Sequence, residues 1–128
     1  MRRILLIDDD PAFTRFLSAY IADNFPLLQV DICNNPMSAL HSIKIGNYDL
    51  MVIDLEMPAM DGLKLLKFAV SAGMDKNRIV ILSGRDADFL HVICPMGTCL
   101  AVLNKFEARQ KSVLDMVFGS LNQKAGSV

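Results

Sequence analysis

The 128-residue sequence lacks tryptophan, an excess of charge of either sign and any long apolar run. Lysine and arginine number 13 against 14 aspartates and glutamates, which argues against a basic nucleic-acid clamp. No apolar stretch approaches the roughly 18 residues of a membrane span. The apolar run from Ile4 to Ile7 is also too short for a secretory signal. We therefore expect no direct binding to nucleic acid and no membrane segment.

Cysteine is also scarce. The three residues Cys33, Cys94 and Cys99 are an odd number and show no paired spacing typical of a zinc site. The simplest interpretation is three buried small apolar side chains in a reducing compartment, so we expect a cytoplasmic protein. A regulatory disulfide between Cys94 and Cys99 is the alternative.

Hydrophobic residues, in contrast, make up 52% of the sequence. At this length they suffice for one hydrophobic core, and no room is left for a second domain. We expect one domain over residues 1–121, followed by a flexible tail over residues 122–128.

Short β-type runs alternate with longer helical patterns five times along the chain. Asp10-Pro11 and Asn35-Pro36 each combine a helix cap with a proline at the first helical position. The expected strands cover residues 3–7, 28–33, 48–53, 78–82 and 100–103. The expected helices run from residue 11 to before Pro26, from 36 to Gly46, from 63 to Gly73, over 86–94, and over 113–121.

This alternation predicts an α/β fold in which helices cover both faces of a five-stranded parallel sheet. Right-handed crossovers leave few topologies, and the flavodoxin-like, doubly wound strand order 2-1-3-4-5 leads over a Rossmann-like variant. The residues after the first strand are Asp8-Asp9-Asp10-Pro11 instead of a glycine-rich turn. Dinucleotide and nucleoside-triphosphate sites are therefore disfavoured.

Polar side chains stand where four of the expected strands end. Asp8 and Asp9 follow the first strand, Asp54 the third, Ser83 the fourth and Lys105 the fifth. In the order 2-1-3-4-5 the first and third strands are neighbours, so the three carboxylates share one crevice. At about 4 Å and an effective dielectric near 20, each pair repels by on the order of 4 kcal/mol. Mg²⁺ relieves such repulsion through oxygen ligands, and Lys105 is a second counter-charge.

Two sequence blocks are more specific than this pattern. The first is Ile-Leu-Leu-Ile-Asp-Asp-Asp-Pro over residues 4–11, and the second is Val-Ile-Asp-Leu-Glu-Met-Pro-Ala-Met-Asp-Gly over residues 52–62. With residues 79–83 and Lys105, they resemble the receiver domains of bacterial two-component response regulators. The resemblance covers residues 3–121. It implies a phosphorylation-controlled signalling switch, and not an enzyme beyond its own phosphorylation and dephosphorylation.

The resemblance also implies roles for individual residues. Asp54 would accept a phosphoryl group from a sensor histidine kinase or phosphotransfer protein, while Ser83 and Lys105 would contact that group. Mg²⁺ would bind Asp9, Asp54 and the backbone carbonyl of Glu56, with Asp8 nearby or acting through water.

The sequence departs from the family at two positions. Phe106 follows Lys105 where the family usually has proline, so we expect a trans peptide bond there. Val102 stands where the family often has an aromatic ring, so a signal would leave through the loops after the fourth and fifth strands or through another side chain. Beside the site, we expect Glu56 and Arg85 to pair over Asp54 and to hinder water.

Two other functions stay open. One is a degenerate receiver that acts only as a protein-binding module, and the other is a small Mg²⁺-dependent phosphohydrolase with an aspartyl-phosphate intermediate. The fourth helix is also unusually apolar, so we expect at least one exposed apolar side chain on it. The face formed by the fourth helix, fifth strand and fifth helix would then serve a homodimer or an output partner. The apolar residues of that helix are Phe89, Leu90, Val92, Ile93 and Met96.

Overall fold

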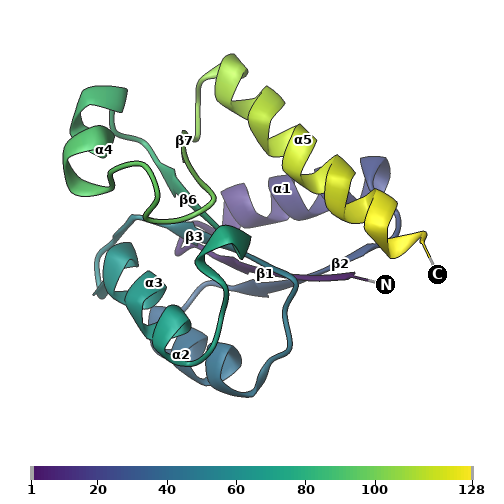
Figure 1. The fold of residues 1–128 in the computed structure, drawn as a ribbon, viewed down its shortest axis with the longest axis horizontal. Coiled ribbons are helices and arrows are strands. Elements are labelled where there is room, and N and C mark those ends of the chain that lie inside the picture. Colours follow the sequence, from purple (N-terminus) through teal and green to yellow (C-terminus); the bar gives the residue numbers. More distant parts are fainter. Residues whose placement is uncertain (1, 128) are drawn as a thin grey trace.

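The computed structural model describes residues 2–127 and contains one five-stranded parallel sheet (Figure 1). Its order is β2-β1-β3-β6-β7, which confirms the predicted order 2-1-3-4-5. The strands are β1 (Arg2–Ile7), β2 (Leu28–Cys33), β3 (Leu50–Asp54), β6 (Ile79–Ser83) and β7 (Ala101–Asn104).

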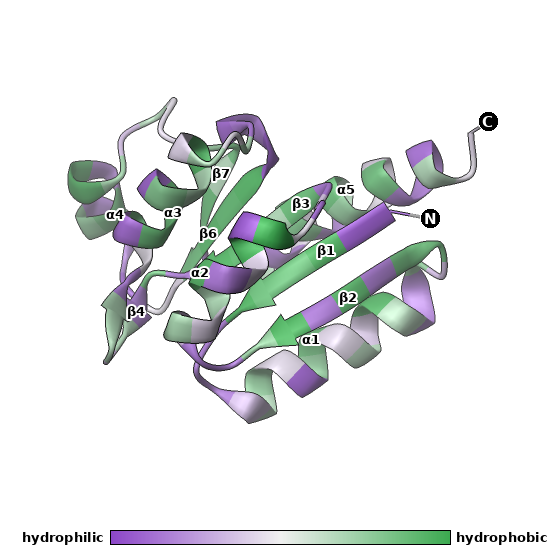
Figure 2. Cartoon of the chain, turned by 90° about the horizontal axis from the view of Figure 1, so that it is seen from below, coloured by the Kyte–Doolittle hydropathy of each residue, from purple (hydrophilic) through white to green (hydrophobic). Residues whose placement is uncertain are grey.

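The helices cover both faces of the sheet, as Figure 1 shows. Alternate residues of β1 point to opposite faces: Ile4 and Leu6 pack with α1 and α5, whereas Leu5 and Ile7 pack with α2, α3 and α4. The inner strands are apolar because both faces are covered, and Figure 2 shows β1 as hydrophobic toward its carboxyl end. The helices are α1 (Pro11–Asn24), α2 (Pro36–Ile45), α3 (Gly62–Ser71), α4 (Ala87–Ile93) and α5 (Ala108–Ala125).

Side-chain caps begin α1 and α2 where the sequence predicts them. The Asp10 carboxylate accepts hydrogen bonds from the backbone N–H groups of Ala12 and Phe13. Asn35 caps α2 in the same way through the N–H of Met37. Since Asp10 serves as the cap, Asp8 and Asp9 are left for another role.

Three strands end one residue later than expected, and this places the site residues in the sheet. Asp54 pairs in register with Leu82, and Ser83 with Asn104. The backbone bond from Lys105 N to Ser83 O, at 2.9 Å, continues the pattern beyond β7. The sheet therefore fixes the backbone of Asp54 and Ser83.

Two segments carry regular structure that the sequence does not predict. After β3, where no strand is predicted, a hairpin forms from β4 (Glu56–Met57) and β5 (Met60–Asp61). Residues 122–125, which lie beyond the predicted end of the last helix at residue 121, continue helix α5. The Asn122 side chain stabilises that last turn, because its Oδ1 accepts a hydrogen bond from Leu27 N at 2.9 Å.

The thiols of Cys33, Cys94 and Cys99 are free and buried, as the simplest interpretation predicted. Burial raises the pKa of the Cys94 thiol and raises that of Cys99 to about 12. Both groups therefore stay protonated and react slowly. Within residues 2–127, no helix combines the length and apolar character needed to cross a bilayer.

Gly62 lets the chain return closely onto Asp54 after the hairpin. Its N–H donates to Leu55 O at 3.1 Å. A Cβ atom at position 62 would lie 2.4 Å from the backbone oxygen of Asp54 and 2.7 Å from the Cα of Leu55. Because both neighbours are backbone atoms, they cannot move aside without shifting the end of β3.

We predict that Gly62→Ala destabilises the protein by about 1–3 kcal/mol, since the added methyl group overpacks a rigid contact. Urea unfolding measures this change. The control is Gly119→Ala in α5, where a Cβ would meet Phe25 Cε1 at an ordinary 3.7 Å. The control should be neutral or stabilising by up to about 1 kcal/mol. Equal stability of Gly62→Ala and the wild type would contradict the close approach.

Candidate functional site

The carboxyl ends of β1 and β3 bring three acids together. One carboxylate oxygen from each of Asp8, Asp9 and Asp54 lies within 4.8 Å of the others. Asp8 is 1% exposed and Asp54 is 4% exposed, whereas Asp9 is accessible to solvent. The strands are direct neighbours, with Ile7 in register with Ile53, so the sheet itself creates this crowding of negative charge.

Lys105 supplies the positive charge in the crevice. Its Nζ lies 2.6 Å from Asp8 Oδ2 and 3.4 Å from Asp54 Oδ1. Burial alone would lower the lysine pKa, but the two carboxylates outweigh it and raise the pKa above the usual value. Lys105 therefore stays an ammonium group.

The residue after Lys105 does not prevent this contact. The peptide bond to Phe106 is trans, as expected, because residues 2–127 contain no cis peptide bond. The Phe106 ring is 79% exposed and leaves the lysine side chain free to turn into the crevice.

The environment of Asp54 penalises its ionised form. Burial first, and then repulsion from Asp8, raise its pKa to about 7. Attraction to Lys105 and a hydrogen bond from Glu56 N to Asp54 Oδ1 at 3.3 Å oppose this rise without cancelling it. The Lys105 ammonium group is thus insufficient to hold the pKa of Asp54 at its ordinary value.

The chemistry of the cluster fits a hard divalent cation such as Mg²⁺. Asp8 Oδ1 accepts a hydrogen bond from Asp10 N, but the buried Oδ2 accepts none within residues 2–127. Its cationic neighbour is Lys105 Nζ, at 2.6 Å. Lys105 supplies one positive charge to three crowded carboxylates, and carboxylate oxygens are the ligands that Mg²⁺ prefers. Asp8, Asp9 and Asp54 would hold such an ion.

Ser83 and Glu56 meet on the other side of Asp54. The buried Ser83 hydroxyl donates to the Glu56 carboxylate, with Oγ 2.8 Å from Oε1 and 2.7 Å from Oε2. The backbone N–H of Gly84 donates to Glu56 Oε1 at 3.0 Å. The hairpin that follows β3 thus places the Glu56 carboxylate against the end of β6.

The expected pair between Glu56 and Arg85 is wrong. Glu56 is held by Ser83 and Gly84 instead, and the Arg85 guanidinium carbon lies 3.8 Å from the centre of the Phe89 ring. The hydrogen bonds from a buried hydroxyl and a fixed N–H hold the carboxylate in a defined geometry, whereas an exposed ion pair contributes only about 0–1 kcal/mol.

Asn104 links the two loops beside the site, a role that spacing alone did not reveal. Its Nδ2 donates to Arg85 O at 3.0 Å, and its Oδ1 accepts from Phe106 N at 2.7 Å and from Glu107 N at 3.2 Å. An asparagine that bonds the N–H two residues on is a known turn signal and could have indicated it. The loop after β6 is therefore tied to the loop after β7.

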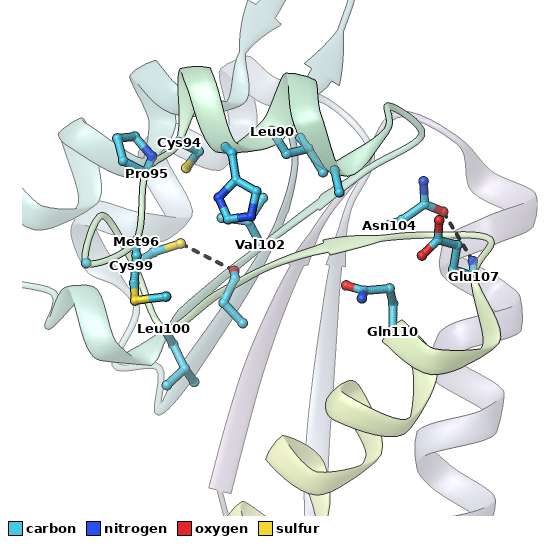
Figure 3. A pocket seen from close by; sticks show the side chains of 14 residues that line it. Leu90, Cys94, Pro95, Met96, Cys99, Leu100, Val102, Asn104, Glu107 and Gln110 are labelled. Atoms are coloured by element: carbon cyan, nitrogen blue, oxygen red, sulfur yellow. Dashed lines mark hydrogen bonds between the residues drawn. The ribbon is translucent and has the colours of Figure 1, made fainter.

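A cavity of about 290 Å³ lies between α4, β7 and α5 (Figure 3). Val102 and Leu90 line it, together with Asn104 from the site edge. The expected exposed apolar side chains are present on and just after α4, since Val92 is 81% exposed and Met96 is 95% exposed. The site edge and this apolar face therefore share Asn104.

The sheet is doubly wound, the acid cluster lies at the ends of β1 and β3, Lys105 directly follows edge strand β7, and the Ser83 hydroxyl ends the neighbouring strand β6. This combination defines the receiver class of signalling modules. The chain matches the family described as "Response regulator receiver domain" over residues 4–114 and belongs to that family.

Individual relatives agree with the family assignment. A protein-glutamate methylesterase/protein-glutamine glutaminase 2 from Dechloromonas aromatica is 31% identical over 65 residues, which are 51% of this chain and 18% of that protein. A two-component response regulator of Clostridium difficile has a similar structure, with a TM-score of 0.79, 19% identity and coverage of 99% and 100% of the two chains. The Thermotoga maritima response regulator TrrA has a TM-score of 0.76 and 22% identity over 91% of this chain and 97% of its own.

The match covers only part of the curated relatives. It spans between 18% and 37% of the length of eight of them. The family match over residues 4–114 establishes a receiver module of two-component signalling, and the rest of those relatives lies outside the similarity.

We predict that, without Mg²⁺, the wild type loses stability relative to Asp54→Asn as pH rises. The Asp54 pKa is about 7 in the folded protein and near the ordinary 3.8 when unfolded. Between these values the folded state binds more protons, so the free energy of unfolding falls with increasing pH. The loss should reach about 1–3 kcal/mol between about pH 5 and pH 8.

Urea unfolding of both proteins at the two pH values measures this change, and asparagine supplies the non-titrating reference. Added Mg²⁺ should restore the stability of the wild type at the higher pH. A difference between the two proteins that stays constant with pH would mean that Asp54 is already ionised at the lower value.

Proposed function

We propose that this chain is a phosphorylation-controlled signalling switch that accepts a phosphoryl group on Asp54. The observation that carries the proposal is the placement of Asp54, which is buried at the end of β3 beside Asp8, 3.4 Å from the Lys105 ammonium group. A carboxylate held among charges that can neutralise an incoming phosphoryl group needs no general base, because it is already the nucleophile when ionised.

The reaction is an in-line displacement. An Asp54 carboxylate oxygen forms a bond to phosphorus while the bond from phosphorus to the donor nitrogen of a phosphohistidine breaks. Lys105 contacts one phosphoryl oxygen, and the Ser83 hydroxyl and Gly84 N–H contact others. The chain itself therefore contributes position and charge neutralisation, without a further catalytic activity beyond its own phosphorylation and dephosphorylation.

Mg²⁺ is the cofactor that we propose for this step. When bound, the ion would neutralise negative charge on the phosphoryl oxygens and on the acids. Asp9 and Asp54 would ligate it directly with the backbone carbonyl of Glu56, and Asp8 would act nearby or through water. The Thermotoga maritima neighbour is described in complex with Mg(2+)-BeF, which supports the same chemistry here.

The partner that we propose is a sensor histidine kinase or a phosphotransfer protein in the cytoplasm. Free, buried thiols are consistent with a reducing compartment. The apolar face of α4, β7 and α5 is the surface that we assign to a homodimer or output partner, since Val92 and Met96 leave it exposed.

We predict that acetyl phosphate with Mg²⁺ adds one phosphate to the wild type and none to Asp54→Asn. Asp9→Ala should lose measurable Mg²⁺ binding, because two buried acids cannot replace the solvent-facing ligand. Intact mass measures the phosphate, and calorimetry measures the metal. Asp88→Asn, which removes an exposed acid of α4, is the control and should behave as the wild type.

The same assay separates the other two functions. A wild type that never gains mass, although folded, would be a binding module without phosphorylation. Continuous release of inorganic phosphate over many turnovers would indicate a phosphohydrolase. A phosphate that persists on Asp54→Asn would overturn the assignment of the acceptor.

A further inference from the structure

The Glu56 carboxylate occupies two hydrogen-bond donors at the end of β6, beside Asp54: the Ser83 hydroxyl and the Gly84 N–H. The Ser83 hydroxyl has one proton, which is directed at the two Glu56 oxygens. The Ser83 oxygen in turn accepts a hydrogen bond from Arg85 N at 3.0 Å. The Gly84 N–H is also committed to Glu56. Neither donor is free for a second anion while Glu56 stays in place.

These donors lie beside Asp54 because of the strand register. Asp54 is paired with Leu82 on the neighbouring strand, so Ser83 and Gly84 come directly after that position. Glu56 lies on the hairpin after β3, and its own backbone N–H donates to Asp54 Oδ1 while its side chain reaches Ser83 and Gly84. An anion on Asp54 and the Glu56 carboxylate would therefore compete for one set of hydrogen-bond donors and repel each other.

We propose that the Glu56 side chain occupies the phosphoryl subsite of the resting protein, and that phosphorylation of Asp54 has to displace it. This inference rests on the proposed function. A carboxylate presents two oxygens to the donors that the phosphoryl oxygens will use. Glu56 is exposed on the hairpin, so its side chain can turn into solvent once it is released. Glu56 thus acts as an internal competitor that sets the affinity of the site for phosphoryl-like anions.

The test measures binding of beryllofluoride with Mg²⁺ by ¹⁹F NMR to the wild type and three variants. Glu56→Ala removes the competitor. Glu56→Asp keeps the charge but shortens the side chain by one methylene, so that it no longer reaches Ser83. Glu107→Ala removes an acid at the same edge of the sheet whose side chain makes no capping bond.

We expect both Glu56 variants to bind beryllofluoride at least about tenfold more tightly, because hydrogen bonds to a charged group no longer have to be broken. Glu107→Ala should match the wild type. Equal affinity of Glu56→Asp and the wild type, with tight binding only by Glu56→Ala, would show simple charge repulsion and overturn the proposal. Equal affinity of all four proteins would overturn it as well.

A second measurement follows the Gly84 amide proton directly. In the unliganded wild type its NMR signal should lie downfield, as for an N–H bonded to a carboxylate, and it should move upfield in Glu56→Ala. An unchanged signal would contradict the contact. If the folded wild type and the Glu56 variants all fail to bind beryllofluoride, the proposed function itself fails, an outcome distinct from equal binding by all of them.

Discussion

Three carboxylates, of which Asp8 and Asp54 are buried, share one edge of the sheet with the ammonium group of Lys105, and the other features of the site follow from that imbalance. Parallel pairing of β1 and β3 places Asp8 and Asp54 side by side, and burial weakens solvation of their charge. Lys105 compensates only in part, so the pKa of Asp54 stays near 7. A divalent cation would supply the positive charge that the cluster lacks, because carboxylate oxygens are its preferred ligands.

The surrounding loops connect this edge to the apolar face. Glu56 holds Ser83 and Gly84 at the end of β6, and Asn104 binds the backbone of Arg85 on that loop. The other end of the Asn104 side chain binds the N–H groups that lead into α5. These hydrogen bonds connect Asp54 through two loops with Asn104, which lines the cavity beside α4 together with Val102.

Much of this architecture could be predicted from the sequence, because it depends on patterns with a strong physical basis. Apolar strands, Asp10 and Asn35 caps and right-handed crossovers determine the sheet, and the sheet brings the acids together. The partner of Glu56 could not be predicted, because the contacts available to an exposed charged side chain differ in free energy by only about 1 kcal/mol. The last turns of α5 could not be predicted either, because the contact of Asn122 with Leu27 joins residues that are distant in sequence.

The most direct test of the charge imbalance is a ¹³C NMR titration of the Asp54 side-chain carboxyl carbon, with and without Mg²⁺. Without the ion, the account predicts a midpoint near 7, since burial and Asp8 disfavour the second buried charge. With saturating Mg²⁺, the midpoint should move well below that value, because the cation favours the ionised carboxylate. A midpoint near the ordinary 3.8 under both conditions would contradict the account.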